Sequence, residues 1–557
     1  MRATTLGLVA LLIAGVAPAA SAAPAGWQPE PATFGVSAPV FTSVRMDDGV
    51  MISTEVVYPT DPASGARAAG NFPVLLTQNP YGAGRSDPTS GGKYFVQRGY
   101  IYVASAIRGT GTSGGQVDWF GDRQGRDGAE LVDWAARALP GSDGLVGLDG
   151  CSYLGVDQWF TAAAVGRHSA LKTIAPFCTD SDFYNDLTAD GGIPTSFVAG
   201  IAHAEPRGPQ DDPATDPQSV TIAQQATGGP RAYDNDYWQQ LDVQRLMPTI
   251  VANGIPALSE AGWQDLFPGG NLGTYVASQN AYFHRPLTAP VTAREPTTGR
   301  YQAIVGPWTH GEHVNEASLQ SIRLEWFDTW LKGARTGMAD TRTPLHLFEN
   351  TASRWVDTAA WPPSPTASSF RFDGGDTLAW APGSSLTYTT APLTRSMVLD
   401  GPSDLTVYAS STTPEVELSA TLNVLAADGH VVKQADGILL GSQRQLDTAQ
   451  SWYADGTLIQ PSHPFTQASQ RAVPVGRSTR YDLSLLANFT EITAGQRIQV
   501  VLTTQPPANF HLAMAPTPRQ LAGLADGVYT IQHATLNLPL AAPDRFRTSS
   551  ADWGPIS

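Results

Sequence analysis

The stretch Gly150-Cys151-Ser152-Tyr153-Leu154-Gly155 decides the fold of this chain. It follows the apolar run Val146-Gly147-Leu148, which is typical of a buried strand, and it precedes a helical pattern over residues 153–164. A serine on a tight strand-to-helix turn is a nucleophile elbow, which exposes its Oγ above a sheet. The strict Gly-x-Ser-x-Gly form is not met, because the second glycine is displaced by one residue. A helix-capping serine fits the same short pattern, so the surrounding elements have to decide.

Those elements alternate between strand and helix. Alternation of this kind predicts a mostly parallel sheet with helices on its faces. The predicted strands are residues 72–77, 100–106, 171–177, 255–258 and 301–305, and the predicted helices are residues 126–138, 153–164 and 319–333.

Two other regions depart from this alternation. Residues 178–249 are interrupted by Pro, Gly, Asp and aromatic residues, which indicates an inserted and mainly helical cap at about 179–250. From residue 351 to residue 557 the chain consists of short β-rich runs separated by turn signals. That texture predicts a β-sandwich of the jelly-roll type.

Composition restricts the classes of protein. The chain has 557 residues, of which 42% are apolar and 15% charged, so it can bury several cores and is not a disordered tail. Its 34 Lys and Arg against 50 Asp and Glu give a formal charge of −16. A nucleic-acid partner is therefore not expected, since phosphate binding needs a basic surface.

The N-terminus has the pattern of a secretory signal. Arg2 is followed by an apolar run over residues 6–16 and by small residues that end in Ala20-Ser21-Ala22. We predict a signal peptide over residues 1–22 that is cleaved after Ala22. The mature protein, whose first domain begins at residue 23, is then expected to be secreted or periplasmic. The apolar run is shorter than the ~20 residues of a membrane span, and no later segment is long and apolar enough.

A serine nucleophile needs a base, and the base needs an acid that fixes its tautomer. Asp265 follows the predicted strand 255–258, and His310 follows the strand 301–305 in the sequence Gly306-Pro307-Trp308-Thr309-His310. The chain order Ser152, Asp265, His310 is that of α/β-hydrolases. The predicted fold is thus an α/β-hydrolase domain over residues 23–350 that carries the cap, followed by a jelly-roll domain over residues 351–557.

His313 is the alternative base, three residues beyond His310, but His310 follows the strand and the Gly-Pro-Trp sequence directly. Neither histidine belongs to a cluster of Cys, His and carboxylate residues with zinc spacing. The sequence therefore predicts no metal and no cofactor.

Together with the elbow, several segments carry a resemblance to a known family. They are Arg45-Met46-Asp47-Asp48-Gly49-Val50, Asn79-Pro80-Tyr81, Arg108-Gly109-Thr110-Gly111-Thr112-Ser113-Gly114, Gly262-Trp263-Gln264-Asp265, Gly306-Pro307-Trp308-Thr309-His310-Gly311 and Trp326-Phe327-Asp328-Thr329-Trp330-Leu331-Lys332-Gly333. The chain resembles the serine hydrolase family of bacterial cocaine esterase and the X-prolyl dipeptidyl peptidases. The resemblance implies the fold just described and an oxyanion hole made by the backbone N–H of Tyr153 and the hydroxyl of Tyr81.

The residues after the acid depart from part of that family. Relatives that act on α-amino acyl groups bind the substrate ammonium with carboxylates placed there, whereas Asp265 is followed by Leu266-Phe267-Pro268. We therefore expect Phe267, together with Trp263, to form apolar walls of the substrate pocket.

Cys151 and Cys178 are the two cysteines, and each follows or ends a predicted strand of one βαβ unit. Export and the closeness of neighbouring strand ends make a disulfide between them a candidate. Two buried free thiols are the alternative.

These observations predict a secreted serine hydrolase that cleaves carboxylic esters, or amides, of small molecules through an acyl-enzyme. An X-prolyl dipeptidyl peptidase is one alternative, and a carbohydrate-associated binding protein with a degenerate hydrolase domain is another. The natural substrate and the oligomeric state are not predicted by the sequence.

Overall fold

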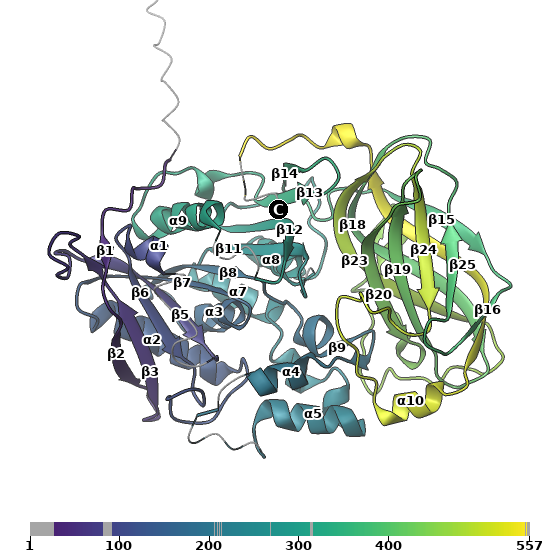
Figure 1. Cartoon of the computed structure of the whole chain (residues 1–557), viewed down its shortest axis with the longest axis horizontal. Coiled ribbons are helices and arrows are strands. Elements are labelled where there is room, and N and C mark those ends of the chain that lie inside the picture. Colours follow the sequence, from purple (N-terminus) through teal and green to yellow (C-terminus); the bar gives the residue numbers. More distant parts are fainter. Residues whose placement is uncertain are drawn as a thin grey trace, which may run out of the picture.

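The computed structural model describes residues 27–81, 92–204, 207–208, 210, 212, 214–267, 269–311, 316–551 and 553. Its N-terminal half is built on a ten-stranded sheet, and its C-terminal part is a separate β-sandwich (Figure 1). The predicted signal peptide lies outside the described residues.

The large sheet has the strand order β14-β13-β12-β11-β8-β7-β5-β6-β3-β2. The strands from β13 to β6 run parallel, while β14, β3 and β2 pair antiparallel at the two edges. In chain order the strands are β2 (Val40–Arg45), β3 (Met51–Val57), β5 (Phe72–Asn79), β6 (Ile101–Ala106), β7 (Ser142–Cys151), β8 (Leu171–Phe177), β11 (Ala257–Gln264), β12 (Tyr301–Thr309), β13 (Leu345–Glu349) and β14 (Arg354–Thr358). A short pair, β1 (Gly35–Val36) and β4 (Pro59–Thr60), stands apart from this sheet.

Helices cover both faces of the sheet, which is why the central strands are apolar nearly throughout. On one face lie α1 (Lys93–Val96) and α9 (Ala317–Leu331), and on the other lie α2 (Asp122–Arg137), α3 (Tyr153–Ala164), α7 (Met247–Asn253) and α8 (Gly270–Tyr282) (Figure 1). Strand β6, for example, is buried at all six positions. Buried side chains above and below the sheet form separate cores.

The cap is inserted between β8 and α7, near the predicted boundaries. It contains a π-helical turn (Tyr184–Thr188), β9 (Ala189–Asp190), β10 (Ile193–Pro194), α4 (Phe197–Ala204), α5 (Pro217–Thr227), α6 (Asp236–Gln239) and two 3₁₀ turns (Pro230–Ala232 and Gln244–Leu246). Helix α5 begins where the Asp216 carboxylate accepts the N–H of Ser219 and ends at the left-handed Gly228. Both ends therefore follow from ordinary capping chemistry.

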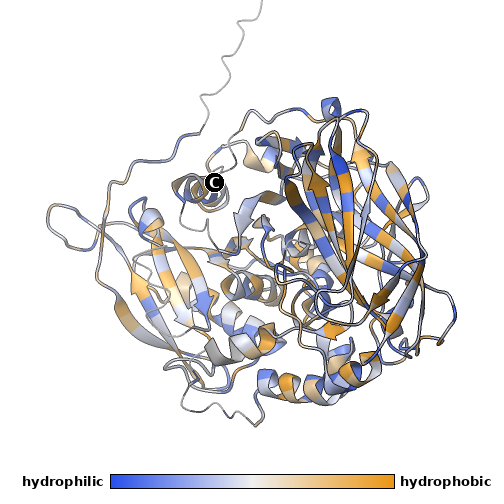
Figure 2. Ribbon diagram, turned by 45° about the vertical axis from the view of Figure 1, so that its right-hand side comes forward, coloured by the Kyte–Doolittle hydropathy of each residue, from blue (hydrophilic) through white to orange (hydrophobic). Residues whose placement is uncertain are grey.

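The C-terminal part consists of two antiparallel sheets packed face to face. One sheet has the order β15-β25-β18-β23 with β16 added beside β25, and the other has the order β17-β24-β19-β20. The strands are β15 (Ala367–Asp373), β16 (Thr377–Ala379), β17 (Ser385–Thr389), β18 (Met397–Ser411), β19 (Glu417–Leu425), β20 (Val431–Leu440), β23 (Thr479–Ile492), β24 (Arg497–Thr503) and β25 (Val528–Ala541). Hydrophobic and hydrophilic residues alternate along several of these strands (Figure 2), as strands with one buried face require. The C-terminal part also contains a small hairpin, β21 (Trp452–Ala454) and β22 (Thr457–Gln460), helix α10 (Pro518–Leu524) and two 3₁₀ turns (Gly441–Gln443 and Pro543–Arg545). A further 3₁₀ turn (Met338–Asp340) lies between α9 and β13 of the N-terminal domain.

The predicted fold class is confirmed: an α/β-hydrolase sheet with an inserted cap precedes a jelly-roll-like sandwich. The sheet extends beyond the boundary set at residue 350, because β13 and β14 form a hairpin that adds to its edge and ends at Thr358. Among the described helices, none has the length and apolar character needed to cross a membrane.

Candidate active site

Ser152 stands on the turn between β7 and α3. Its backbone dihedrals are φ 62° and ψ −128°, outside the regions that a residue with a side chain favours. The Ser152 N–H donates to the carbonyl of Phe177 on the neighbouring β8, and its own carbonyl accepts the N–H groups of Gly155 and Val156. This strained and fully anchored turn has the backbone geometry that a nucleophile elbow requires.

The two flanking glycines allow the helix to approach the sheet closely. A Cβ at Gly155 would lie 2.6 Å from Thr179 Cγ2 and 2.7 Å from the Phe177 carbonyl oxygen, and a Cβ at Gly150 would lie 2.6 Å from Leu154 Cβ. A glycine one position later than in the strict motif therefore serves the packing of α3 against β8.

Parallel strands bring the other two candidate residues to the same edge of the sheet. Strands β7, β8, β11 and β12 are consecutive parallel neighbours, so their carboxyl ends lie together. Asp265 follows β11 directly, and His310 follows β12 directly. The distance from Ser152 Oγ to His310 Nε2 is 3.0 Å, and the distance from His310 Nδ1 to Asp265 Oδ1 is 2.8 Å.

This geometry orients Ser152, His310 and Asp265 for proton transfer. The Asp265 side chain is fully buried, whereas the His310 side chain retains 25% of its exposure. Asp265 Oδ1 also accepts the N–H of Phe267 at 3.0 Å, which holds the carboxylate in place. A neutral imidazole that donates Nδ1–H to Asp265 presents its Nε2 lone pair to the serine hydroxyl. The alternative base, His313, lies outside the described residues.

The two predicted pocket residues lie in different surroundings. The Phe267 ring meets the His310 ring edge to face at 5.4 Å, and Phe197 of α4 meets Phe267 at 5.8 Å. Trp263 instead packs beside Trp361 and donates its indole N–H to the carbonyl of Phe348. We correct the expectation for Trp263: its side chain belongs to the core, because alternate residues of a strand face opposite sides of the sheet.

The Tyr153 side chain is held by residues that no sequence motif singled out. Its hydroxyl donates to Gln124 Oε1 at 2.8 Å, and its ring stacks on Phe120 at 3.9 Å. Gln124 Oε1 also accepts the N–H of Phe120. The first turn of α3 is thereby fixed to α2, and with it the peptide N–H that follows Ser152. In the sequence, the only sign of these contacts is Gln124, a polar residue on the buried face of the amphipathic helix α2.

Tyr81 lies at the end of β5, next to β7 in the sheet. Their parallel register aligns Leu76 with Leu148, so that Asn79 and Cys151 end their strands at the same edge. The N–H of Tyr81 donates to Asn79 Oδ1 at 2.9 Å, which closes a turn at this edge. The backbone of Tyr81 therefore lies at the same edge of the sheet as Ser152, where the parallel strands end.

The two cysteines are neighbours but free thiols, which corrects the candidate disulfide. Cys151 is aligned with Phe177 in the parallel register, and Cys178 is the residue that follows Phe177. Cys178 has a left-handed conformation with φ 55°. Burial raises the pKa of the Cys178 thiol well above its ordinary value, and the adjacent Cys151 thiol adds to the increase. A thiol that stays protonated is a poor nucleophile and oxidises slowly.

Cys178, Asp265 and His310 place one potential metal-ligand atom each within 4.8 Å of one another. The 2.8 Å contact between His310 Nδ1 and Asp265 Oδ1 is a hydrogen bond. A metal ion here would have to displace the shared proton before it could bind these two atoms. The raised pKa of Cys178 also disfavours the thiolate that zinc requires. Within the described ranges, this trio is better explained as an acid–base pair beside a buried thiol.

Comparisons with known proteins agree with this architecture. Residues 48–312 match the family model described as X-Pro dipeptidyl-peptidase (S15 family), and residues 364–535 match that of the X-Pro dipeptidyl-peptidase C-terminal non-catalytic domain. Among curated relatives, a protein of Mycobacterium tuberculosis (strain CDC 1551 / Oshkosh), provisionally named a serine esterase, is 23% identical over 86% of this chain and 92% of its own. The cocaine esterase of Rhodococcus sp. (strain MB1 Bresler) is 26% identical over 60% of this chain and 61% of its own.

Solved structures share the fold at low sequence identity. A CocE/NonD family hydrolase from Staphylococcus aureus superposes with a TM-score of 0.70 at 18% identity, covering 90% of this chain and 93% of the other. An α-amino acid ester hydrolase superposes with a TM-score of 0.66 at 17% identity, covering 94% and 100%.

The fold and these relatives define the class of the molecule, which is a serine hydrolase. The two family models that match consecutive parts of the chain are both described as parts of X-Pro dipeptidyl-peptidases. The chain belongs to the family of bacterial cocaine esterase and the X-Pro dipeptidyl-peptidases.

Proposed function

We propose that this protein is an exported esterase that hydrolyses carboxylic esters of small molecules, with Ser152 as nucleophile, His310 as general base and Asp265 as the residue that orients His310. The single observation that carries the proposal is the unbroken chain of contacts from Ser152 Oγ to His310 Nε2 at 3.0 Å and from His310 Nδ1 to Asp265 Oδ1 at 2.8 Å. Nucleophile, base and orienting acid at these distances are what acyl transfer requires.

The reaction proceeds in two halves. Ser152 Oγ attacks the ester carbonyl while its proton passes to His310 Nε2, and the collapsing intermediate expels the alcohol, which takes that proton. Water then attacks the acyl-serine ester, His310 accepts its proton and returns it to Ser152 Oγ, and the carboxylic acid leaves. The N–H of Tyr153 and the hydroxyl of Tyr81 bind the oxyanion of each intermediate, a role in which one donor is worth about 3–4 kcal/mol.

The walls beside His310 favour an apolar acyl or leaving group. Phe267 covers one edge of the imidazole, and Phe197 extends this aromatic wall into the cap. Neither side chain can pair with a substrate charge, so neutral esters are the better substrates.

An X-Pro dipeptidyl-peptidase is the second candidate, because both family models bear that description. The two candidates share the proposed chemistry and differ in the substrate. Hydrolysis of p-nitrophenyl esters of increasing acyl length should exceed that of alanyl-prolyl-p-nitroanilide by at least about tenfold in kcat/KM. A preference for the anilide would make the chain a peptidase instead.

The catalytic assignment is tested separately with Ser152→Ala. We expect a loss of activity of at least about 10⁴-fold and of labelling by a fluorophosphonate, with an unchanged melting temperature. Activity within severalfold of the original chain would overturn it.

A further inference from the structure

A cavity of about 370 Å³ lies between the cap and the sandwich, and none of its lining residues belongs to the candidate active site. The cap contributes Gly228, Ala232 and Tyr233, and the remaining lining residues come from the sandwich and from α10. A volume in the range of ordinary small-molecule sites, roughly 300–1,000 Å³, makes it large enough for a ligand.

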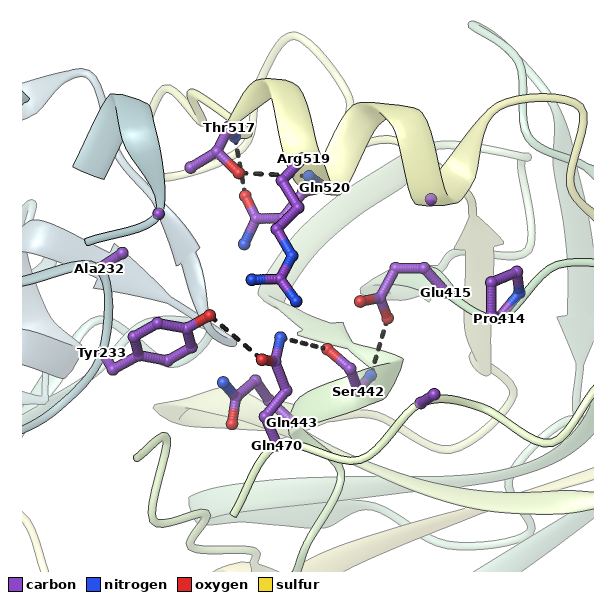
Figure 3. A pocket seen from close by; sticks show the side chains of 13 residues that line it. Ala232, Tyr233, Pro414, Glu415, Ser442, Gln443, Gln470, Thr517, Arg519 and Gln520 are labelled. Atoms are coloured by element: carbon purple, nitrogen blue, oxygen red, sulfur yellow. Dashed lines mark hydrogen bonds between the residues drawn. The ribbon is translucent and has the colours of Figure 1, made fainter. Parts of the chain in front are cut away.

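One wall is a continuous line of hydrogen bonds that joins the two domains (Figure 3). The Tyr233 hydroxyl donates to Gln470 Oε1 at 3.1 Å, and Gln470 Nε2 donates to Ser442 Oγ at 3.3 Å. The N–H of Ser442 in turn donates to Glu415 Oε1 at 2.8 Å. These polar side chains are thus fixed before any ligand arrives.

Two opposite charges face this cavity without pairing. The Arg519 guanidinium extends from α10 into the space between Tyr233 and Glu415 (Figure 3). Among the described residues, the Arg519 guanidinium has no hydrogen-bond or ion-pair partner. The Glu415 carboxylate is 8% exposed. Among the described residues its hydrogen bonds come from Val416 and Ser442, neither of which carries a charge.

The nearest other cation does not neutralise Glu415 by contact. Arg444 interacts with it electrostatically, but its guanidinium donates to the carbonyls of Gly441, Arg471 and Ala472. A buried carboxylate without a cation is unfavourable, and burial accordingly raises the pKa of Glu415.

We propose that this cavity binds a small zwitterion of the amino acid or dipeptide class, with the ligand carboxylate on Arg519 and the ligand ammonium on Glu415. A ligand that carries both charges supplies each side chain with its missing partner at once, whereas a simple anion would face Glu415 and a simple cation would face Arg519. The Gln443 amide, the second N–H of the Gln470 amide and the lone pairs of the Tyr233 hydroxyl then face the peptide or side-chain polar groups of the ligand. Because the cavity is shared by the two domains, occupancy joins the cap to the sandwich.

The test is calorimetric titration of the full chain with L-alanyl-L-alanine. We expect one binding site, and at least tenfold weaker binding of N-acetyl-L-alanyl-L-alanine and of L-alanyl-L-alaninamide, each of which lacks one charge. Arg519→Gln should remove the advantage of the dipeptide over the amide, and Glu415→Gln its advantage over the acetylated form. Arg477→Gln, on an exposed arginine of the sandwich outside the lining, is the matched control and should change nothing.

Three results would overturn the proposal: no heat of binding at 10 mM dipeptide, binding that Arg519→Gln leaves unaltered, or tighter binding of D-glucose than of the dipeptide. The melting temperature of each variant verifies that it is folded. Ester hydrolysis is expected to continue in all of them, so that failure here and failure of the catalytic assignment are separate outcomes.

Discussion

Two histidine–aspartate pairs lie on neighbouring strands of the same sheet and have the same contact distance. His310, after β12, has Asp265 Oδ1 2.8 Å from its Nδ1, and His346, in β13, has Asp357 Oδ1 at the same distance from its Nδ1. The other nitrogen differs: Nε2 of His310 faces Ser152 Oγ, whereas Nε2 of His346 lies 3.2 Å from Gln302 Oε1. His346 is 1% exposed and its ring stacks on Trp553 at 3.5 Å. A histidine–aspartate pair alone therefore does not indicate a catalytic role. That role depends on which group Nε2 contacts and on whether substrate can reach it.

Alanine at each histidine separates the two roles most strongly. His310→Ala should lower kcat by about 10⁴–10⁶-fold with little change in stability, because it removes the proposed base from a partly open site. His346→Ala should lower the free energy of unfolding by about 2 kcal/mol, since it leaves buried partners unsatisfied, while the kcat of the folded fraction persists. Ester hydrolysis and urea denaturation measure both, and the reverse pattern would mean that the two pairs have been assigned the wrong way round.

The acids extend this contrast at somewhat smaller effect. Asp265→Asn should lower kcat by about 10⁴-fold, because an amide no longer fixes the imidazole tautomer. Asp357 also accepts the Ser549 hydroxyl and the Trp553 indole N–H, so Asp357→Asn should mainly weaken the C-terminal attachment, by about 1–3 kcal/mol. Equal losses of kcat in the two variants would contradict the comparison.

The proposed oxyanion donor comes next in size. Tyr81→Phe removes one hydroxyl and hardly any volume, so kcat should fall by about 10²–10³-fold with KM nearly unchanged. Tyr233→Phe, which removes a hydroxyl at the distant cavity, is the matched control and should retain full esterase activity. Unchanged kcat in Tyr81→Phe would make this tyrosine a packing residue.

The sequence predicted the parts of the molecule that local patterns encode. Helix Tyr153–Ala164 and strand Leu171–Phe177 have the predicted bounds, and Ser152, Asp265 and His310 were selected by their positions after strands. The sheet edge β13–β14 was missed, because a short antiparallel hairpin has the same local texture as the sandwich that follows it. The direction of a strand side chain depends on register, which explains the misplacement of Trp263.

The cavity and the contacts between domains could not be predicted in this way. Tyr233, Glu415, Gln470 and Arg519 are spread over nearly 300 residues of chain and carry no shared motif. Only the packing of the cap on the sandwich collects them, and that packing depends on side-chain shapes rather than on periodicity.

A third histidine sharpens the comparison through pH. His511 bridges the domains, with Nδ1 2.6 Å from Asp436 of the sandwich and Nε2 3.3 Å from Asp190 of the cap. Burial lowers the pKa of His511 and Lys433 opposes the charge as well, but Asp436 and Asp190 outweigh them and the pKa is raised. A raised pKa stabilises the fold below the ordinary histidine value of ~6.5, and this stabilisation is lost as the pH rises through the higher folded value.

The excess stability of the original chain over His511→Gln should therefore shrink as the pH rises from 6 to 9. Urea denaturation at each pH gives the difference in the free energy of unfolding. A difference that grows with pH would show that the two carboxylates do not hold a charged imidazole between them.

The smallest effect is expected at the two cysteines, of which Cys178 lies within 4.8 Å of Asp265 and His310. Cys178 is fully buried with a raised pKa, so it should neither take part in hydrolysis nor form a bridge readily. Titration of the denatured but unreduced protein should find two thiols per chain, and dithiothreitol should leave both kcat and the melting temperature unchanged. Fewer than two thiols, with a lower melting temperature after reduction, would show that export oxidises the pair, and the turn that carries Ser152 would then be held by a covalent bond in addition to the hydrogen bonds described for it.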